Sequence, residues 1–117
     1  MPRINYTDNS KKELAEIRKY ITAELKNPIA AKNVLNGIKR LITAIGQTPT
    51  IGTPLAAAIG KDILSDNAIS SMKNYRRAIS GNYLIFYHYD ETEVVIDDVI
   101  YGGRDLQTLF MDIEHEG

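Results

Sequence analysis

The side chains best suited to chemistry in this sequence are arginines within or just after apolar segments. Arg76 and Arg77 lie in the run YRRAI, and Arg104 follows Gly102 and Gly103 at the end of a longer apolar run. A guanidinium group can bind a phosphate or a carboxylate through two parallel hydrogen bonds. Gly102 and Gly103 have no side chains that would crowd Arg104, so Arg104 is a candidate for contacting a phosphate or a carboxylate.

Arg104 has a structural interpretation as well. It can form an ion pair with one of the nearby carboxylates, Asp97, Asp98 or Asp105. The two glycines then serve only as a turn between a strand and a helix, because glycine is free in φ. Both interpretations stay open at this stage.

The acid–base groups available to these arginines are few. Cleavage of RNA through the 2′-hydroxyl needs a base, cations for the phosphorane charge and an acid. His88 alternates with Leu84 and Phe86, which favours a hydrogen-bonded structural histidine, and the tyrosines Tyr75, Tyr83, Tyr87 and Tyr89 are further candidates. With no cysteine and two histidines, the sequence predicts neither a metal site nor a cofactor.

Two helices are expected in the first half of the chain. Apolar residues at helical spacing predict a helix over 10–26. Its N-cap suits Thr7, Asp8, Asn9 or Ser10, and Glu13 follows Ser10 by three residues as in a capping box. Asn27 and Pro28 end that helix and start a second one, because Asn caps and Pro fits a first turn. The second helix carries a broad apolar stripe and is expected to end at Gly46.

Strands are expected in the second half. Residues 72–79, 83–90 and 93–101 are rich in β-branched and aromatic residues and are separated by short turns. Residues 3–6 suit an edge strand, 47–71 are expected to be irregular with one helical turn, and a short helix is expected after Asp105. We therefore predict one α+β domain over 1–117, with the order β-α-α-β-β-β-α and a frayed tail at 114–117.

The strand expected at 83–90 is apolar on both faces. Its alternating side chains are Tyr83, Ile85, Tyr87 and Tyr89 on one face and Leu84, Phe86 and His88 on the other. This pattern is typical of a central strand. A helical hairpin covers one face only, so the other face needs the last helix, the 47–71 segment or another protein.

The composition is that of an ordinary soluble protein, and its charges are segregated. Residues 1–46 hold nine basic and four acidic residues, and residues 47–117 hold five basic and eleven acidic ones. A net charge of -1 argues against an obligate nucleic-acid binder. No segment suits a membrane span or a signal peptide, and the lack of cysteine favours the cytoplasm.

Several segments occur in an order that resembles a known family. They are Leu25-Lys26-Asn27-Pro28 with Ala30-Ala31, then Asn82-Tyr83-Leu84-Ile85-Phe86-Tyr87, then Ile100-Tyr101-Gly102-Gly103-Arg104-Asp105 with Leu109. In this order they resemble the RelE/ParE superfamily, the toxins of type II toxin–antitoxin modules. Two positions depart from its pattern: Leu84 replaces a common arginine, and Gly103 replaces the first of two arginines.

The resemblance implies a helical hairpin on a small antiparallel sheet and an antitoxin, with an acidic tail, that wraps the toxin. It also implies one of two activities. RelE-type members cleave mRNA in the ribosomal A site, and ParE-type members inhibit DNA gyrase. In the nucleases the position six residues after the arginine is often Tyr, but here it is Phe110, which cannot transfer a proton.

The long helical hairpin, the few acid–base groups and the near-neutral charge favour the ParE-like activity. The alternatives are a ribosome-dependent mRNA endoribonuclease and an inactive relic that only binds its antitoxin. The residues expected to contact the target or the antitoxin are Arg76, Arg77, Tyr87, Arg104, Leu109 and Phe110. If the protein is a nuclease, Arg76, Arg77 and Arg104 are the candidate catalytic residues.

Overall fold

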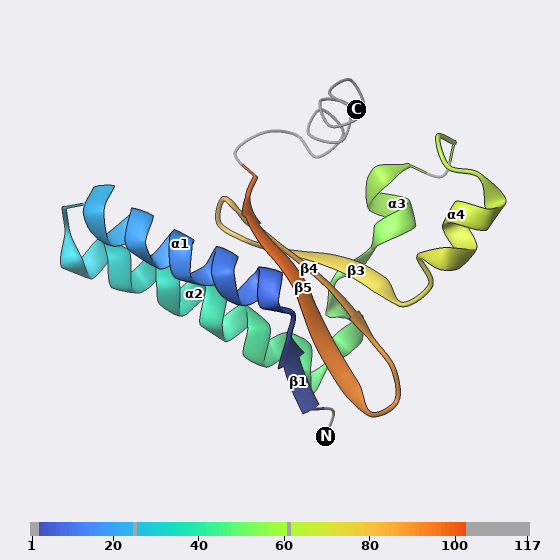
Figure 1. Ribbon diagram of the computed structural model, residues 1–117, viewed down its shortest axis with the longest axis horizontal. Helices are drawn as coiled ribbons and strands as arrows, with labels where there is room; N and C mark the ends of the chain where they lie inside the picture. Colours follow the sequence, from blue (N-terminus) through green and yellow to red (C-terminus); the bar gives the residue numbers. More distant parts are fainter. Residues whose placement is uncertain (1–2, 25, 61, 103–117) are drawn as a thin grey trace.

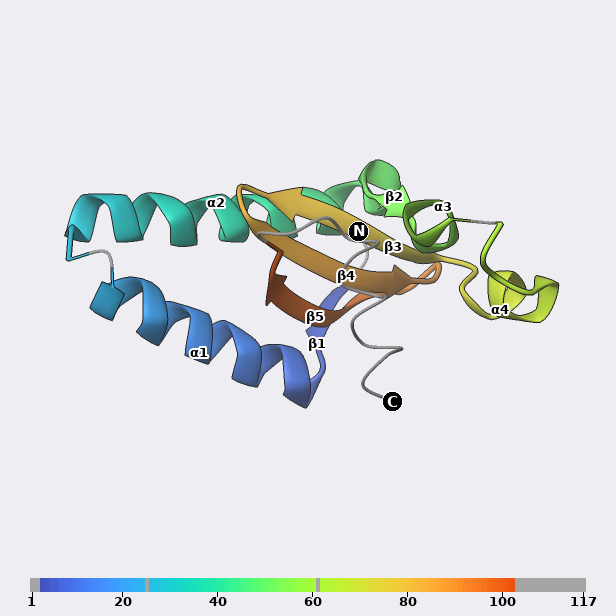
Figure 2. The same ribbon diagram turned by 90° about the horizontal axis from the view of Figure 1, so that it is seen from above.

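A two-helix hairpin packs on one face of a five-stranded sheet (Figures 1 and 2). The computed structural model describes residues 3–24, 26–60 and 62–102. The elements are β1 (Arg3–Tyr6), α1 (Asp8–Glu24), α2 (Pro28–Gln47), the 3-10 helix η1 (Pro49–Ile51), β2 (Thr53–Pro54), α3 (Leu55–Ile59), α4 (Asp66–Ser71), β3 (Tyr75–Ser80), β4 (Tyr83–Tyr89) and β5 (Glu93–Tyr101). The α+β class is confirmed.

The two long helices begin at side-chain caps. Thr7 caps α1, because its hydroxyl accepts a hydrogen bond from the Ser10 amide at 3.0 Å. Thr7 is one of the four residues expected to suit this cap; Ser10, another of them, is buried in the first turn of the helix, where its hydroxyl donates to the Thr7 carbonyl. Asn27 caps α2 as predicted, since its side chain accepts from the amides of Ile29 and Ala30.

The sheet has the strand order β1-β5-β4-β3-β2. β1 pairs with β5 in parallel, and the other neighbours are antiparallel. β5 has the predicted bounds, and a register irregularity between Phe86 and Tyr87 leaves Asp97 opposite no residue of β4. β4 is the central strand, as its two apolar faces indicated.

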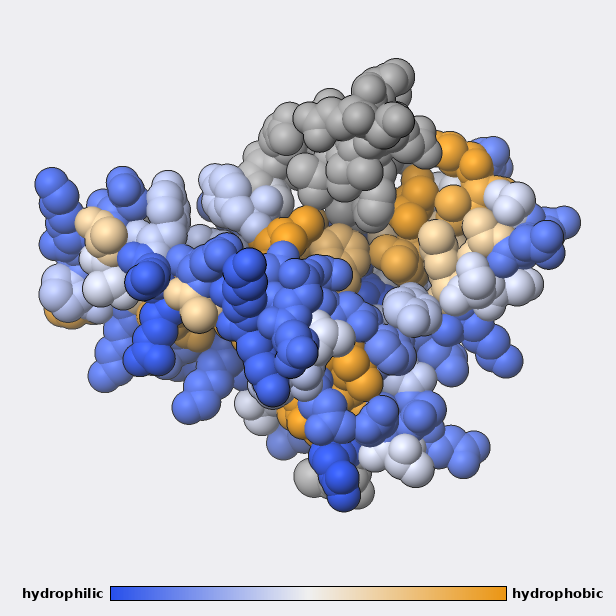
Figure 3. Space-filling view, in the orientation of Figure 1, coloured by the Kyte–Doolittle hydropathy of each residue, from blue (hydrophilic) through white to orange (hydrophobic). Residues whose placement is uncertain are grey.

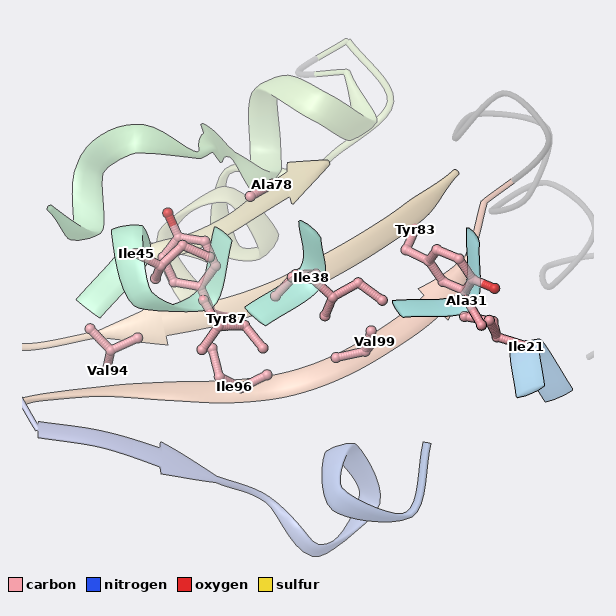
Figure 4. Close-up of a cluster of buried hydrophobic side chains, with 12 residues drawn as sticks. Ile21, Ala31, Ile38, Ile45, Ala78, Tyr83, Tyr87, Val94, Ile96 and Val99 are labelled. Carbon is pink, nitrogen blue, oxygen red and sulfur yellow. The ribbon is translucent and has the colours of Figure 1, made fainter. Parts of the chain in front are cut away.

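The core lies between the α1–α2 hairpin and one sheet face (Figure 4). Ile38, Ile42 and Ile45 of α2 pack against Ile85 and Tyr87 of β4. Gly46 lets this helix approach β1, because a Cβ atom there would collide with the side chain of Ile4. The helical stripe read from the sequence is therefore the inner face of the domain.

The opposite face of the sheet carries a second set of large side chains. Register pairs Tyr75 with His88, Arg77 with Phe86, and Ile79 with Leu84 on this face. Leu84 is buried, whereas Ile79 is 54% exposed and Tyr75 is 36% exposed. The described residues therefore cover this face incompletely, in line with the expectation that the helical hairpin covers one face only.

The segment between α2 and β3 is more ordered than predicted. Instead of an irregular stretch with one helical turn, it holds η1, β2, α3 and α4. α3 and α4 lie at the end of the molecule away from the α1–α2 turn (Figure 1). The helix expected after Asp105 and the tail at 114–117 lie outside the described residues.

The Asn27 cap gives a first prediction. Asn27→Ala leaves the first amides of α2 without their side-chain acceptor, so the free energy of unfolding should fall by about 1 kcal/mol. Urea denaturation measures the change. Asn33→Ala, the same substitution on the exposed surface of α2, should cause no loss. Equal effects of the two substitutions would contradict the assigned cap.

Candidate functional site

Of the three candidate arginines, the structure describes Arg76 and Arg77. Arg104, Leu109 and Phe110 lie outside the described residues. Arg76 and Arg77 are neighbours on β3 and point to opposite faces of the sheet, since Arg76 pairs in register with Tyr87 and Arg77 with Phe86. The two arginines therefore have different surroundings and different uses.

Arg76 holds the loop that leads into β2. Its Nη1 donates to the carbonyl of Gly52 at 2.6 Å and to that of Thr50 at 3.2 Å. Its guanidinium carbon lies 5.8 Å from the centre of the Tyr89 ring, in reach of a cation–π interaction. These contacts give Arg76 a structural role on the helix side of the sheet.

Tyr87 holds the same loop from the core. Its side chain is fully buried, its hydroxyl donates to the Pro49 carbonyl at 2.6 Å, and it accepts from the Gly52 amide at 3.0 Å. Burial is the main cause of the raised pKa of this phenol. A partner cannot reach this side chain, so the expectation that Tyr87 contacts one is revised to a role in supporting the loop.

Arg77 faces the side of the sheet opposite the helices. It lies between Tyr75 and Ile79 in the outward row of β3. Its Nε is buried and has no hydrogen-bond partner, and no ion pair to its guanidinium occurs in the described part of the chain. A cation left without a counter-charge can bind a carboxylate or a phosphate of another molecule.

His88 lies beside Arg77 on the same face. Its Nδ1 is 2.7 Å from a carboxylate oxygen of Asp97, and its ring stacks on Tyr75 with 4.7 Å between centroids. Because an ionised carboxylate only accepts hydrogen bonds, this contact places a proton on Nδ1. The hydrogen-bonded histidine expected from the sequence is present, and Nε2 is the nitrogen left for a ligand.

A carboxylate cluster joins α1 to β5. Asn9 Nδ2 donates to Asp98 at 2.6 Å and to Glu13 at 3.1 Å, and Glu13 also accepts from the Val99 amide. Burial and the adjacent Asp98 raise the pKa of Glu13 to about 7. Sequence reasoning missed this pair, because its two carboxylates are far apart in the chain and no local pattern links them.

A hollow of about 650 Å³ lies next to this cluster, between α1 and the adjoining ends of β4 and β5. Its walls include Ile17 and Tyr20 of α1, Tyr83 of β4 and Tyr101 of β5. The rings of Tyr83 and Tyr101 meet edge to face, with 5.6 Å between centroids. Figure 3 shows apolar surface in the region between α1 and β5. We refer to this hollow as the tyrosine groove.

Comparisons with known proteins identify the family of this fold. Residues 4–106 match the family described as the ParE toxin of type II toxin–antitoxin system, parDE. The chain belongs to the ParE toxin family. A chain of the solved "Chromosomal ParDE TA system from P. aeruginosa" has the same fold as this ParE-family toxin, at a TM-score of 0.57 and 13% identity. The similarity covers 86% of this chain and 96% of that one.

A comparison with curated proteins finds no match to this toxin sequence. In the part of the ParE-family chain that the structure describes, no helix is long and apolar enough to cross a membrane. The same residues contain no group of three or more His, Asp or Glu side chains that could hold a metal ion.

The Tyr87 hydroxyl is expected to stabilise the toxin fold. Tyr87→Phe leaves the Gly52 amide and the Pro49 carbonyl without their partner, so the free energy of unfolding should fall by about 1–3 kcal/mol. Thermal or urea denaturation measures the loss. Tyr101→Phe removes a hydroxyl from a side chain that is 62% exposed and should have almost no effect. A stable Tyr87→Phe protein would show that the loop does not depend on this hydroxyl.

Glu13 is expected to make stability depend on pH. Its folded pKa of about 7 exceeds the ordinary value of 4.5, so the folded protein binds this proton more tightly than the unfolded chain. The contribution is therefore complete below about pH 4.5 and is lost as the pH rises through about 7. We expect a loss on the order of 1 kcal/mol between pH 5 and 8.

Glu13→Gln tests this dependence, because the amide can still donate to Asp98 but does not titrate. Denaturation midpoints measured from pH 5 to 8 should fall less in Glu13→Gln than in the wild type. Glu24→Gln, on the exposed end of the same helix, is the control and should keep the wild-type slope. The assignment is wrong if Glu13→Gln keeps that slope too.

Proposed function

We propose that this ParE-family toxin arrests growth by binding and inhibiting an essential enzyme such as DNA gyrase. The match over residues 4–106 to the ParE toxin family carries this proposal. The protein acts in the cytoplasm as one toxin domain over 1–117, without a metal or a cofactor. A co-encoded antitoxin with an acidic tail neutralises it.

The proposed mechanism is occlusion of the target by a surface at the sheet end. In the described residues this surface includes the outward row of β3, which places Arg77 between the partly exposed Tyr75 and Ile79. An arginine flanked by an aromatic and an aliphatic side chain is a typical protein-binding arrangement. Arg104, Leu109 and Phe110 extend the proposed surface, and Arg76 supports it from behind through the Gly52 loop.

One observation favours a second candidate, the ribosome-dependent mRNA endoribonuclease. Asp97 orients His88, and Arg77 is its diagonal neighbour on the same sheet face, at about 7–8 Å by strand geometry. A neutral His88 could accept the proton of a ribose 2′-hydroxyl, and Arg77 could stabilise the phosphorane. The described residues place no comparable acid beside the pair, so the binding mechanism is preferred.

The arginines provide the test. Arg77→Ala should lower inhibition of gyrase supercoiling by purified toxin about tenfold, and Arg104→Ala should abolish toxicity, because each removes a charged contact. Both variants should remain folded by circular dichroism. Arg40→Ala, at an exposed position on α2, is the matched control and should inhibit like the wild type.

Three outcomes separate the candidates. Suppressed supercoiling with an SOS response supports the gyrase inhibitor. Codon-linked mRNA ends in primer extension, lost in His88→Gln, would replace it with the nuclease. Normal growth without the antitoxin would identify an inactive relic, and unchanged toxicity of Arg104→Ala would remove that residue from the site.

A further inference from the structure

The tyrosine groove combines an apolar floor with an acidic rim. Ile17 and Ile21 of α1 and Val34 of α2 contribute apolar side chains, and Glu13 and Glu16 lie at the edge. No lysine or arginine lines the groove among the described residues. The groove is thus a negatively charged, partly apolar surface, even though most residues of α1 outside it are basic or polar.

The carboxyl groups at the rim lie close together, and Asp98 and Glu16 help Glu13 to hold its proton. Asn9 brings Glu13 and Asp98 together, and Glu16 lies close enough to add to the repulsion that raises the pKa of Glu13. The one ion pair found among the described residues, His88 with Asp97, involves none of these three groups. A cation bound beside these groups would therefore pair with Glu16 and favour the ionised form of Glu13.

Three aromatic rings add a second feature that favours cations. Tyr20 and Tyr101 are both 62% exposed, and Tyr83 lies buried beneath Tyr101. The faces of tyrosine rings attract guanidinium and ammonium groups, most strongly where water is partly excluded. Carboxylates beside tyrosine rings form a site for a cationic side chain whose aliphatic stem lies on the apolar floor.

We infer that the tyrosine groove binds a segment of the antitoxin in which an arginine or a lysine is flanked by aliphatic residues. This inference rests on the proposed function, because it assumes that a co-encoded antitoxin is the partner. Charge complementarity identifies the occupant: the cation meets Glu13 and Glu16 and stacks on Tyr20, and the aliphatic neighbours cover Ile17 and Ile21.

The acidic tail of the antitoxin does not suit this groove. Its carboxylates would lie beside Glu13, Glu16 and Asp98, which form no ion pair among the described residues, and such contacts between acidic groups cost binding free energy. An acidic tail fits Arg77 on the opposite sheet face, which has no ion pair among the residues that the structure describes. The antitoxin is therefore expected to contact the toxin through two segments of opposite charge, and the basic one occupies the groove.

Binding of the co-purified antitoxin to toxin variants tests the inference. Glu16→Lys should weaken binding about tenfold or more, whereas Glu24→Lys, the same reversal at an exposed position of α1 outside the groove, should change it about twofold or less. Tyr20→Leu should weaken binding, whereas Tyr20→Phe, which keeps the aromatic ring, should bind the antitoxin like the wild type. Equal effects of the two lysine variants would overturn the inference.

A second experiment needs no antitoxin and remains decisive if the proposed function fails. The toxin is titrated with the peptides acetyl-Leu-Arg-Leu-amide and acetyl-Leu-Glu-Leu-amide, and the NMR signals of the tyrosine rings are followed. The arginine peptide should shift the signals of Tyr20 and Tyr101, and the glutamate peptide should not. Equal shifts, or none with either peptide, would overturn the cation site. Growth arrest by the free toxin, measured separately, tests the function itself.

Discussion

The structure depends on the burial of one face of β4 beneath α2. Ile85 and Tyr87 have no exposed surface there, and the Tyr87 hydroxyl is the polar exception that this core must satisfy. The hydroxyl forms hydrogen bonds with the backbone of the loop around Gly52. A Cβ atom at Gly52 would lie only 2.6 Å from that hydroxyl. The same loop leads into β2 at the sheet edge, so a single buried phenol links core packing to the edge of the sheet.

The two neighbouring arginines of β3 point to opposite faces of the sheet and have different surroundings. Arg76 binds the backbone of the Gly52 loop, whereas Arg77, one residue later, faces the other side and forms no ion pair within the described ranges. Ion pairs contribute little to the described fold, in which His88 and Asp97 form the one that is present. Apolar packing and backbone hydrogen bonds hold the described part of the domain together, and Arg77 and the carboxyl groups of Glu13 and Asp98 lie on separate surfaces of it.

Sequence patterns predicted the long elements because periodicity extends over many residues in them. The stripe of α2, its Asn27 cap and the bounds of β5 all follow from local residue types. The short elements between Pro49 and Ser71 escaped prediction, because contacts with β3 and with Tyr87 determine much of their structure. The contacts of Arg76 with the Gly52 loop and of Glu13 with the Val99 amide were equally hidden, since these partners lie 24 to 86 residues away.

The parallel pairing of β1 with β5 has a consequence for biosynthesis. Arg3 to Tyr6 are made some 90 residues before their partners, Glu93 to Ile96. During translation the nascent chain therefore cannot complete its sheet until residues 93–96 have left the ribosome exit tunnel.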